Sequence, residues 1–396
     1  MSRTAKLVTL LLAFLCIGTS ACCGQATKPR LHRTASRPAA HIPAVRRRQL
    51  RGMSQFDRRS LALFSRVLTE MVRDGQYVDG VWHPSYACWW CGDQLGTVAA
   101  ILARRQPGGR FAELAIKTFD TGLSEHPPGD GTFGPPASAN EITTATMAVA
   151  LGVAYIEMED QLPHSIAVRW QDAVIAADHW LAPTIAFYVN GNVNLQVSLA
   201  LYVGWLVSGQ RAMLVDYKRS LAFTLHPGPK WPGFGLHYTK RPKNPLGTDG
   251  AAYLAEKGAG APGFDPHYTI LQADYASELY LLSGQTSVLR LTNLLMNQLL
   301  TRIDRATLII NTGSGSRHPQ PNVMGRFESN VLPVLAFTTS PDLLRLLPKQ
   351  LEFVEADFPN YVRADNDQDQ VIANYALALI GSQAPALPTT AKTRHG

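Results

Sequence analysis

Helix-length apolar patterns, separated by loops rich in glycine and proline, fill the chain beyond residue 52 and most strongly limit what it can fold into. We find no convincing run of alternating apolar and polar residues, which is the pattern of a half-buried strand. The sequence therefore predicts an all-α domain of about 12 helices. They are expected at 54–73, 93–105, 111–124, 138–159, 165–181, 194–208, 211–224, 268–283, 286–302, 327–337, 341–356 and 368–380.

Two architectures suit a run of antiparallel helix pairs over residues 52–385, namely an open solenoid and a closed ring of two concentric helical layers. A solenoid repeats a short sequence unit at a fixed period. We find no such period, and the connections are unequal in length, with a long one at 226–267. We therefore expect one α/α-toroid domain, complete or incomplete. Because long loops in compact domains are usually functional or disordered, the aromatic and glycine-rich loop 226–267 is a candidate site segment.

The first 22 residues are typical of a signal peptide. Arg3 and Lys6 precede an apolar run at 7–18, and small residues then lead to Cys22. The run is shorter than the roughly 20 residues of a membrane-spanning helix. Cys22 is placed like the lipid-carrying cysteine of a bacterial lipoprotein. Secretion and a lipid tether through Cys22 at the outside of the cytoplasmic membrane both remain open.

The formal charge of +7 is concentrated at the start of the chain. Residues 1–51 hold 10 Lys or Arg and no Asp or Glu, which leaves 27 basic and 30 acidic residues for the remainder. Residues 23–51 are interpreted as a basic linker rich in Pro and Arg that cannot bury a core, and residues 386–396 as a disordered tail. Because the domain itself is slightly acidic, we expect no nucleic-acid partner. We expect a monomer.

Cys88 and Cys91 are the cysteines that the expected domain contains. Their spacing suits a redox site or half of a zinc site, but no second Cys or His pair has ligand spacing and no βαβ pattern surrounds them. A structural disulfide and two free thiols both remain open. We expect neither a metal nor a cofactor.

Four segments at expected helix edges combine aromatic or amide side chains with glycines, at 86–93, 188–194, 263–275 and 313–318. Such composition suits sugar binding, because the C–H face of a sugar stacks on an aromatic ring while its hydroxyl groups need hydrogen-bond partners. The candidate substrate-binding residues are Trp89, Trp90, Asp93, Tyr188, Trp231, Tyr268 and His318.

In their order, these motifs resemble those of the α/α-toroid polysaccharide lyases that cleave hyaluronan, chondroitin or xanthan, and more loosely those of the alginate lyases. The paired-Trp segment is similar to an aromatic subsite, Gly191-Asn192 to an Asn segment, and Gly-Ser-Gly-Ser-Arg at 313–317 to an Arg segment. His267 and Tyr275 are eight residues apart, which is the spacing of a His and a Tyr in that family. The resemblance implies catalytic roles for Asn192, Asn194, His267, Tyr275 and Arg317.

The resemblance implies β-elimination within a uronic-acid polysaccharide. Asn192 or Asn194, with Arg317, would hold the sugar carboxylate and stabilise the charge that develops on it. Tyr275 would remove the neighbouring proton, with His267 as helper or alternative base, because imidazole titrates near neutrality.

Two further functions remain open. Toroids of this kind also host inverting glycoside hydrolases, which need an acid and a base roughly 6.5 to 9.5 Å apart. A non-catalytic glycan-binding protein of the cell envelope would use the aromatic residues without chemistry. The candidate carboxylates for hydrolysis are Asp93, Glu141, Asp249 and Asp265.

Overall fold

The computed structural model of the chain describes residues 55–83, 89–125, 131–133, 141–186, 190–258, 260–321, 323–324, 352 and 355–356. The expected signal peptide, linker and C-terminal tail lie outside these ranges, as does Cys22. Within the described ranges, no helix is both long enough and apolar enough to cross a membrane.

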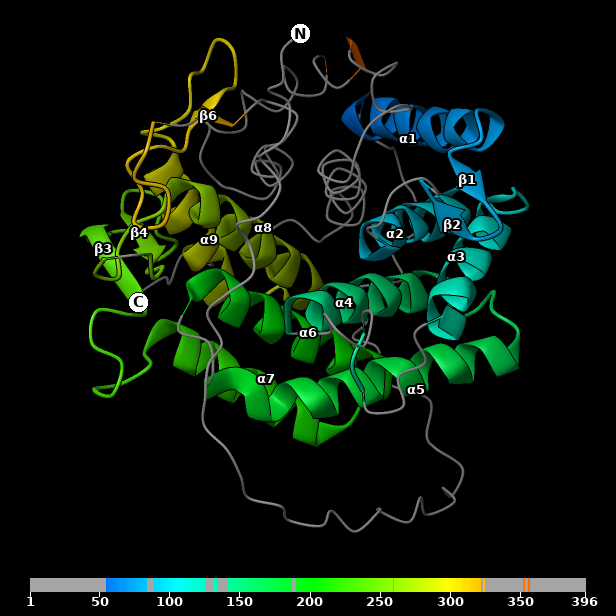
Figure 1. Cartoon of the computed structure of the whole chain (residues 1–396), viewed down its shortest axis with the longest axis horizontal. Coiled ribbons are helices and arrows are strands. Elements are labelled where there is room, and N and C mark those ends of the chain that lie inside the picture. Colours follow the sequence, from blue (N-terminus) through cyan, green and yellow to red (C-terminus); the bar gives the residue numbers. More distant parts are fainter. Residues whose placement is uncertain are drawn as a thin grey trace, which may run out of the picture. The chain divides into compact units, whose positions relative to one another are not determined.

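The described part of the chain is mostly helical (Figure 1). Each of its α-helices lies where the sequence predicts one, with ends that differ by at most four residues, so the all-α prediction is confirmed. The predicted helices at 327–337 and 368–380, and most of 341–356, lie outside the described residues. The helices are α1 (Gln55–Arg73), α2 (Trp89–Arg105), α3 (Phe111–Glu125), α4 (Glu141–Met158), α5 (His164–Leu181), α6 (Gly191–Ser208), α7 (Arg211–Leu225), α8 (Pro266–Ser283) and α9 (Thr286–Leu299), with a 3-10 helix at Ala182–Ala186.

Three short antiparallel strand pairs, which the sequence did not predict, lie in the segments that follow α1, α7 and α9. The middle hairpin lies inside the long loop 226–267 and pairs His237 with Tyr253. Strands of two to five residues are too short to repeat an alternating pattern, so periodicity could not reveal them. The pairs are β1 (Tyr77–Val78) with β2 (Val81–Trp82), β3 (Leu236–Lys240) with β4 (Ala251–Leu254), and β5 (Ile310–Asn311) with β6 (Val323–Met324).

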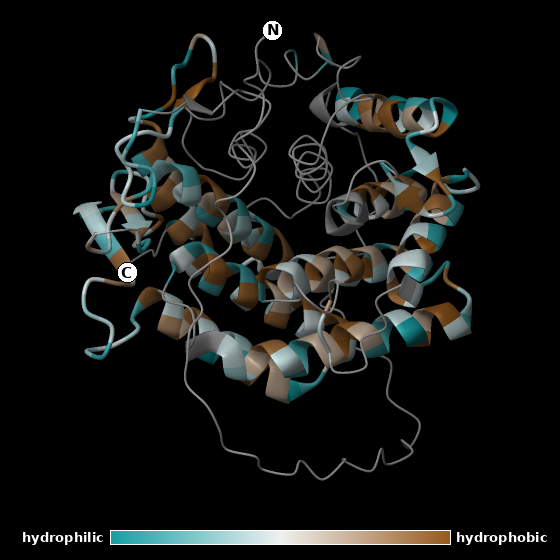
Figure 2. Cartoon of the chain, viewed as in Figure 1, coloured by the Kyte–Doolittle hydropathy of each residue, from teal (hydrophilic) through white to brown (hydrophobic). Residues whose placement is uncertain are grey.

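The helices form two layers. In the inner layer α2 packs on α4, α4 on α6 and α6 on α8, while α3, α5, α7 and α9 each cover the inner helix that precedes them in the chain (Figure 1). This is the arrangement of an α/α toroid, as the sequence predicts. The layers explain the hydropathy patterns: α6 is buried on nearly all sides, whereas α1 separates its apolar and polar residues onto two faces (Figure 2).

The inner helices run parallel to one another, because each is followed by an outer helix that returns the chain. Contacts between residues at similar depth show this. The Thr97 hydroxyl of α2 donates to the Ala150 carbonyl of α4 (3.1 Å), and Gln196 Nε2 of α6 donates to Thr146 Oγ1 of α4 (2.7 Å).

Arg104 at the carboxyl end of α2 also pairs with Asp160 just beyond α4. A Cβ atom at Gly191, where α6 begins, would lie 3.3 Å from Gln272 Nε2 in the second turn of α8. The amino ends of α2, α4, α6 and α8 therefore lie at the same end of the layer.

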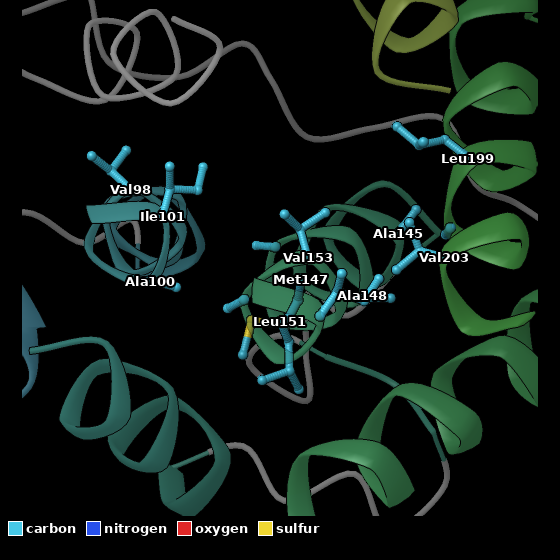
Figure 3. Packing of buried hydrophobic residues seen from close by; sticks show 14 of the residues in the cluster. Val98, Ala100, Ile101, Ala145, Met147, Ala148, Leu151, Val153, Leu199 and Val203 are labelled. Atoms are coloured by element: carbon cyan, nitrogen blue, oxygen red, sulfur yellow. The ribbon is translucent and has the colours of Figure 1, made fainter. Parts of the chain in front are cut away.

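The contact between α4 and α6 depends on small residues. Figure 3 shows Ala145 and Ala148 of α4 on the side that faces Val203 of α6. One turn beyond Ala148, a Cβ atom added at Gly152 would lie 2.2 Å from Val203 Cγ1. Glycine at this position therefore allows the two helices to approach closely.

We expect Gly152→Ala to destabilise the domain by about 1 to 3 kcal/mol, because the added methyl group would overpack a buried interface. Combining it with Val203→Ala should relieve the clash, so that the double variant loses less stability than the two single variants together. Urea unfolding at equilibrium measures all three losses.

Gly260→Ala is the control, since its new Cβ atom would have nothing within 4 Å, and it should leave the unfolding midpoint unchanged. Strictly additive losses for Gly152→Ala and Val203→Ala would contradict the steric explanation.

Candidate active site at the amino ends of the inner helices

Glu256, two residues beyond β4, connects the first turn of α6 to the second turn of α8. Its side chain is 0% exposed. Its Oε1 atom accepts hydrogen bonds from the Asn192 backbone N–H at the start of α6 (2.7 Å) and from Gln272 Nε2 on α8 (2.8 Å). Gln272 also donates to the Leu254 carbonyl and accepts from the Leu254 N–H, so β4 is fixed against the same helices.

The second carboxyl oxygen of Glu256 has a different environment. Oε2 is buried and has no hydrogen-bond partner among the described residues, and Arg317 Nη1 lies 3.8 Å from it. Burial raises the pKa of Glu256 to about 7, an effect that the Asn192 N–H, Gln272 and Arg317 oppose and that the charge of Asp265 reinforces. Glu256 therefore titrates near neutrality.

Asp265 fixes the loop that contains Arg317, the positively charged residue of the site. Its side chain caps α8 by accepting from the Tyr268 backbone N–H (3.2 Å). Asp265 Oδ2 also accepts from the backbone N–H groups of Arg317 (2.8 Å) and His318 (3.0 Å). Gly315 is needed here, because a Cβ atom at this position would lie 2.5 Å from Asp265 Oδ2.

Ser316 fixes the same loop to the strand-like segment that contains Glu256. Its hydroxyl donates to the Glu256 carbonyl (2.8 Å), and its backbone N–H donates to the Phe264 carbonyl (2.9 Å). Glu256 itself pairs with Gly263 in an isolated antiparallel bridge. Residues 256–258, 260–265 and 313–318 therefore form one cross-connected unit.

The partly exposed face of this unit consists of a cation, a phenol and two imidazoles. The guanidinium carbon of Arg317 lies 4.1 Å from the centre of the Tyr268 ring. The His318 ring stacks on Tyr268 at 5.4 Å and lies 4.8 Å from the His267 ring. Arg317 and His318 keep 32% and 34% of their side chains exposed, so a ligand can reach both.

His318 is oriented by a buried carboxylate. Its Nδ1 atom lies 3.2 Å from Asp265 Oδ1, and the Asp265 side chain is 0% exposed. An N–H at Nδ1 that donates to Asp265 leaves Nε2 as the acceptor nitrogen of a neutral imidazole. This carboxylate–imidazole pairing is the geometry of an oriented general base.

Several residues that the sequence singled out lie together in this site. Asn192 lies in the first turn of α6 beside Glu256, and the residue is 7% exposed. Asn194 is buried in the same turn. The residues that gather around Asp265 and Glu256 are His267, Tyr268, Arg317 and His318.

Other candidates lie elsewhere or outside the description. Tyr275 lies two turns further along α8 and packs against the hydrophobic core, and burial raises its pKa far above the ordinary value. Asp249 accepts from the backbone N–H groups of Asn244 and Lys243, which hold its pKa below the usual range. Trp231 is half-buried in the turn before β3. Glu141 begins α4, at the same end of the inner layer as the site, but no contact joins it to the cluster among the described residues.

The first turns of α2 contain Trp89, Trp90 and Asp93, at the same end of the inner layer as the site. Their side chains, that of Cys91 and the whole of Tyr188 lie outside the described part of the chain, and so does Cys88.

Sequence reasoning missed Glu256 and Gln272. Glu256 follows the apolar run 251–255, which contains β4, and an acid just after a buried strand is a usable signal only once the strand is recognised. Gln272 lies inside α8, where one amide among helical residues has no distinguishing pattern.

We expect the free energy of unfolding to fall as pH rises from about 4.5 to about 7, partly because of Glu256. In this window the unfolded chain has lost the Glu256 proton while the folded chain still holds it, so rising pH favours unfolding. The loss should be about 3 kcal/mol and should level off above neutrality. Urea unfolding across this pH range measures it.

Glu256→Gln should remove that part of the pH dependence while keeping an acceptor for Asn192 and Gln272. The difference between the two proteins isolates Glu256 from other buried acids. Identical pH profiles would mean that Glu256 does not titrate near neutrality.

No protein-family model matches the chain, and no curated protein matches it in sequence. Among solved structures it is similar to an inactive variant of the α-1,6-mannanase GH76A of Salegentibacter sp. HEL1_6 in complex with α-1,6-mannotetrose. The TM-score is 0.51 at 10% identity, over 83% of this chain and 100% of that one. At this identity the likeness concerns the fold, and it agrees with the two helical layers.

Two further structures are similar at 10% identity and a TM-score of 0.49 each. One is the same mannanase GH76A, over 82% of this chain and 99% of that one. The other is a mutant of the unsaturated glucuronyl hydrolase of Streptococcus agalactiae, over 86% of this chain and 96% of that one.

Proposed function

We propose that this protein is a carbohydrate-active enzyme that cleaves a uronic-acid polysaccharide by β-elimination. The observation that supports this best is the convergence of Asn192, His267, Tyr268, Arg317 and His318 around two buried carboxyl groups at the amino ends of α6 and α8. Elimination needs a cation for the sugar carboxylate, a base and an acid, and these residue types supply all three.

In the proposed reaction a base removes the proton on C5, next to the sugar carboxylate. The electron pair of the broken C5–H bond forms the C4–C5 double bond, and the C4–O4 bond breaks as the leaving oxygen takes a proton. Arg317 binds the carboxylate and stabilises the negative charge that develops on it. The Asn192 side-chain amide, in the first turn of α6 beside Glu256, is the proposed hydrogen-bond donor to the same carboxylate.

We assign the base to His318, because Asp265 holds its Nδ1 atom and leaves Nε2 to take the proton. His267, 4.8 Å away between ring centres, is the group that protonates the leaving oxygen. The resemblance to the lyases instead suggests Tyr275 as the base. The burial of Tyr275 opposes this role, because its phenol keeps its proton at neutral pH.

His318→Asn should lower kcat for elimination by about 10² to 10⁴-fold, because it removes the base but keeps a polar side chain. The assay follows the ultraviolet absorbance of the unsaturated uronate together with the number of new reducing ends. The substrates are hyaluronan, chondroitin, alginate, polygalacturonate and xanthan, with an α-1,6-mannan as the neutral comparison.

His237→Asn is the matched control, because His237 lies on β3, stacked on Tyr253, and takes no part in the cluster. It should retain the rate of the unchanged protein. An undiminished rate in His318→Asn would exclude His318 as the base.

Hydrolysis by an inverting mechanism is the second candidate, and the pKa of Glu256 near 7 favours it, because a glycosidase acid must hold its proton near neutrality. In that case reducing ends would appear without ultraviolet absorbance. Glu256→Gln, and not His318→Asn, would then abolish the activity.

We also propose that the protein acts outside the cytoplasmic membrane. This rests on the signal-peptide pattern of residues 1–22.

A further inference from the structure

Arg317 lies between a buried carboxyl group and the protein surface. On one side, Glu256 Oε2 is buried without a hydrogen-bond partner among the described residues, and its 3.8 Å distance from Arg317 Nη1 is too long for a hydrogen bond. On the other side, about a third of the Arg317 side chain is exposed. The guanidinium group can therefore interact with a second carboxylate from solution.

We propose that Glu256 and Arg317 form a proton-coupled binding site for the carboxylate of a sugar acid, in which Glu256 takes up one proton from solvent when that carboxylate binds Arg317. This inference rests on the proposed function, because it takes a uronate as the ligand. The total charge balances: one anion and one proton enter together, and the guanidinium then pairs with the ligand while Glu256 is a neutral acid.

The physical reason is the repulsion between two carboxylates that share one cation. The Oε2 atom of Glu256 has no hydrogen bond among the described residues, so the nearby charge of Arg317 adds to the Oε1 hydrogen bonds in stabilising the anion. A ligand carboxylate beside Arg317 offsets that stabilisation and adds a like charge, and both effects favour protonation of Glu256. The Oε1 hydrogen bonds from Asn192 and Gln272 hold the side chain in place in either state.

The groups around Glu256 come from each element packed on it. Arg317 approaches from the loop 313–318, Asp265 from the segment before α8, and Tyr268 and Tyr275 from α8. Burial raises the pKa of both phenols above the ordinary value, so they stay neutral near pH 7. From α6, the contact is the Asn192 backbone N–H. Among these groups, Arg317 supplies the positive charge.

The proposal fixes how affinity depends on pH. With Glu256 near its pKa of about 7 before binding, affinity for a sugar acid should fall as pH rises above neutrality, by up to about tenfold per pH unit. Well below that pH Glu256 is already protonated, so binding takes up no further proton there.

Calorimetric titration tests the proton uptake. Short uronate oligosaccharides from hyaluronan, chondroitin and polygalacturonate are titrated into the full-length protein in buffers of different ionisation enthalpy, slightly above neutral pH. We expect an uptake that approaches one proton per ligand bound. Glu256→Gln should bind the same oligosaccharide with affinity independent of pH near neutrality and without proton uptake.

Asp160→Asn is the control, because Asp160 follows the carboxyl end of α4, where it pairs with Arg104 at the opposite end of the inner layer. It should keep the proton uptake of the unchanged protein. Proton uptake that persists in Glu256→Gln would belong to a group other than Glu256 and would overturn the proposal.

A measurement without ligand tests the coupling directly. Arg317→Gln should shift the protonation midpoint of Glu256 to higher pH, because Arg317 favours its ionised form. The midpoint is read from the infrared carboxyl band that disappears in Glu256→Gln. An unchanged midpoint in Arg317→Gln would overturn the inference.

The outcomes separate this inference from the proposed reaction. Binding with proton uptake but without elimination would support the binding site and overturn the lyase proposal. Binding without proton uptake would overturn the binding site even if the oligosaccharides are cleaved. A failure of all three oligosaccharides to bind would overturn the sugar-acid ligand.

Discussion

The close parallel packing of α4 on α6 is the constraint on which the rest of the structure depends. Gly152 allows it, and the bond from Gln196 to Thr146 sets its register. Helices buried on several sides satisfy their backbone groups internally, except for the first N–H groups and the last carbonyls. The loops must supply partners at those ends, and Glu256 does so for Asn192 of α6.

Two buried carboxyl groups then organise the loops. Asp265 gathers backbone N–H groups from α8 and from residues 317 and 318, so its burial is compensated by several donors. Glu256 has fewer donors and keeps one oxygen without a hydrogen bond among the described residues. Asp265 therefore holds the loops of the site in place, while Glu256 is able to change its charge near neutral pH.

The sequence was sufficient to locate the helices because each repeats its apolar pattern over several turns. The site was harder to predict, because Glu256 meets Asn192 across 64 residues of sequence, which no local pattern encodes. The spacing of His267 and Tyr275 shows a second limit. Both residues lie in α8, and eight residues along a helix correspond to about 12 Å along its axis. The spacing of the motif therefore keeps these two side chains apart.

The parallel inner layer also has an electrostatic consequence that involves no side chain. An α-helix carries roughly half a positive elementary charge at its amino end, and α2, α4, α6 and α8 have that end on the same side of the layer. The amino ends of α6 and α8 border the site, so their peptide dipoles contribute a positive potential there. Substitution of Arg317 leaves this potential intact, so the backbone itself biases this end of the domain toward anions, and added salt weakens that bias.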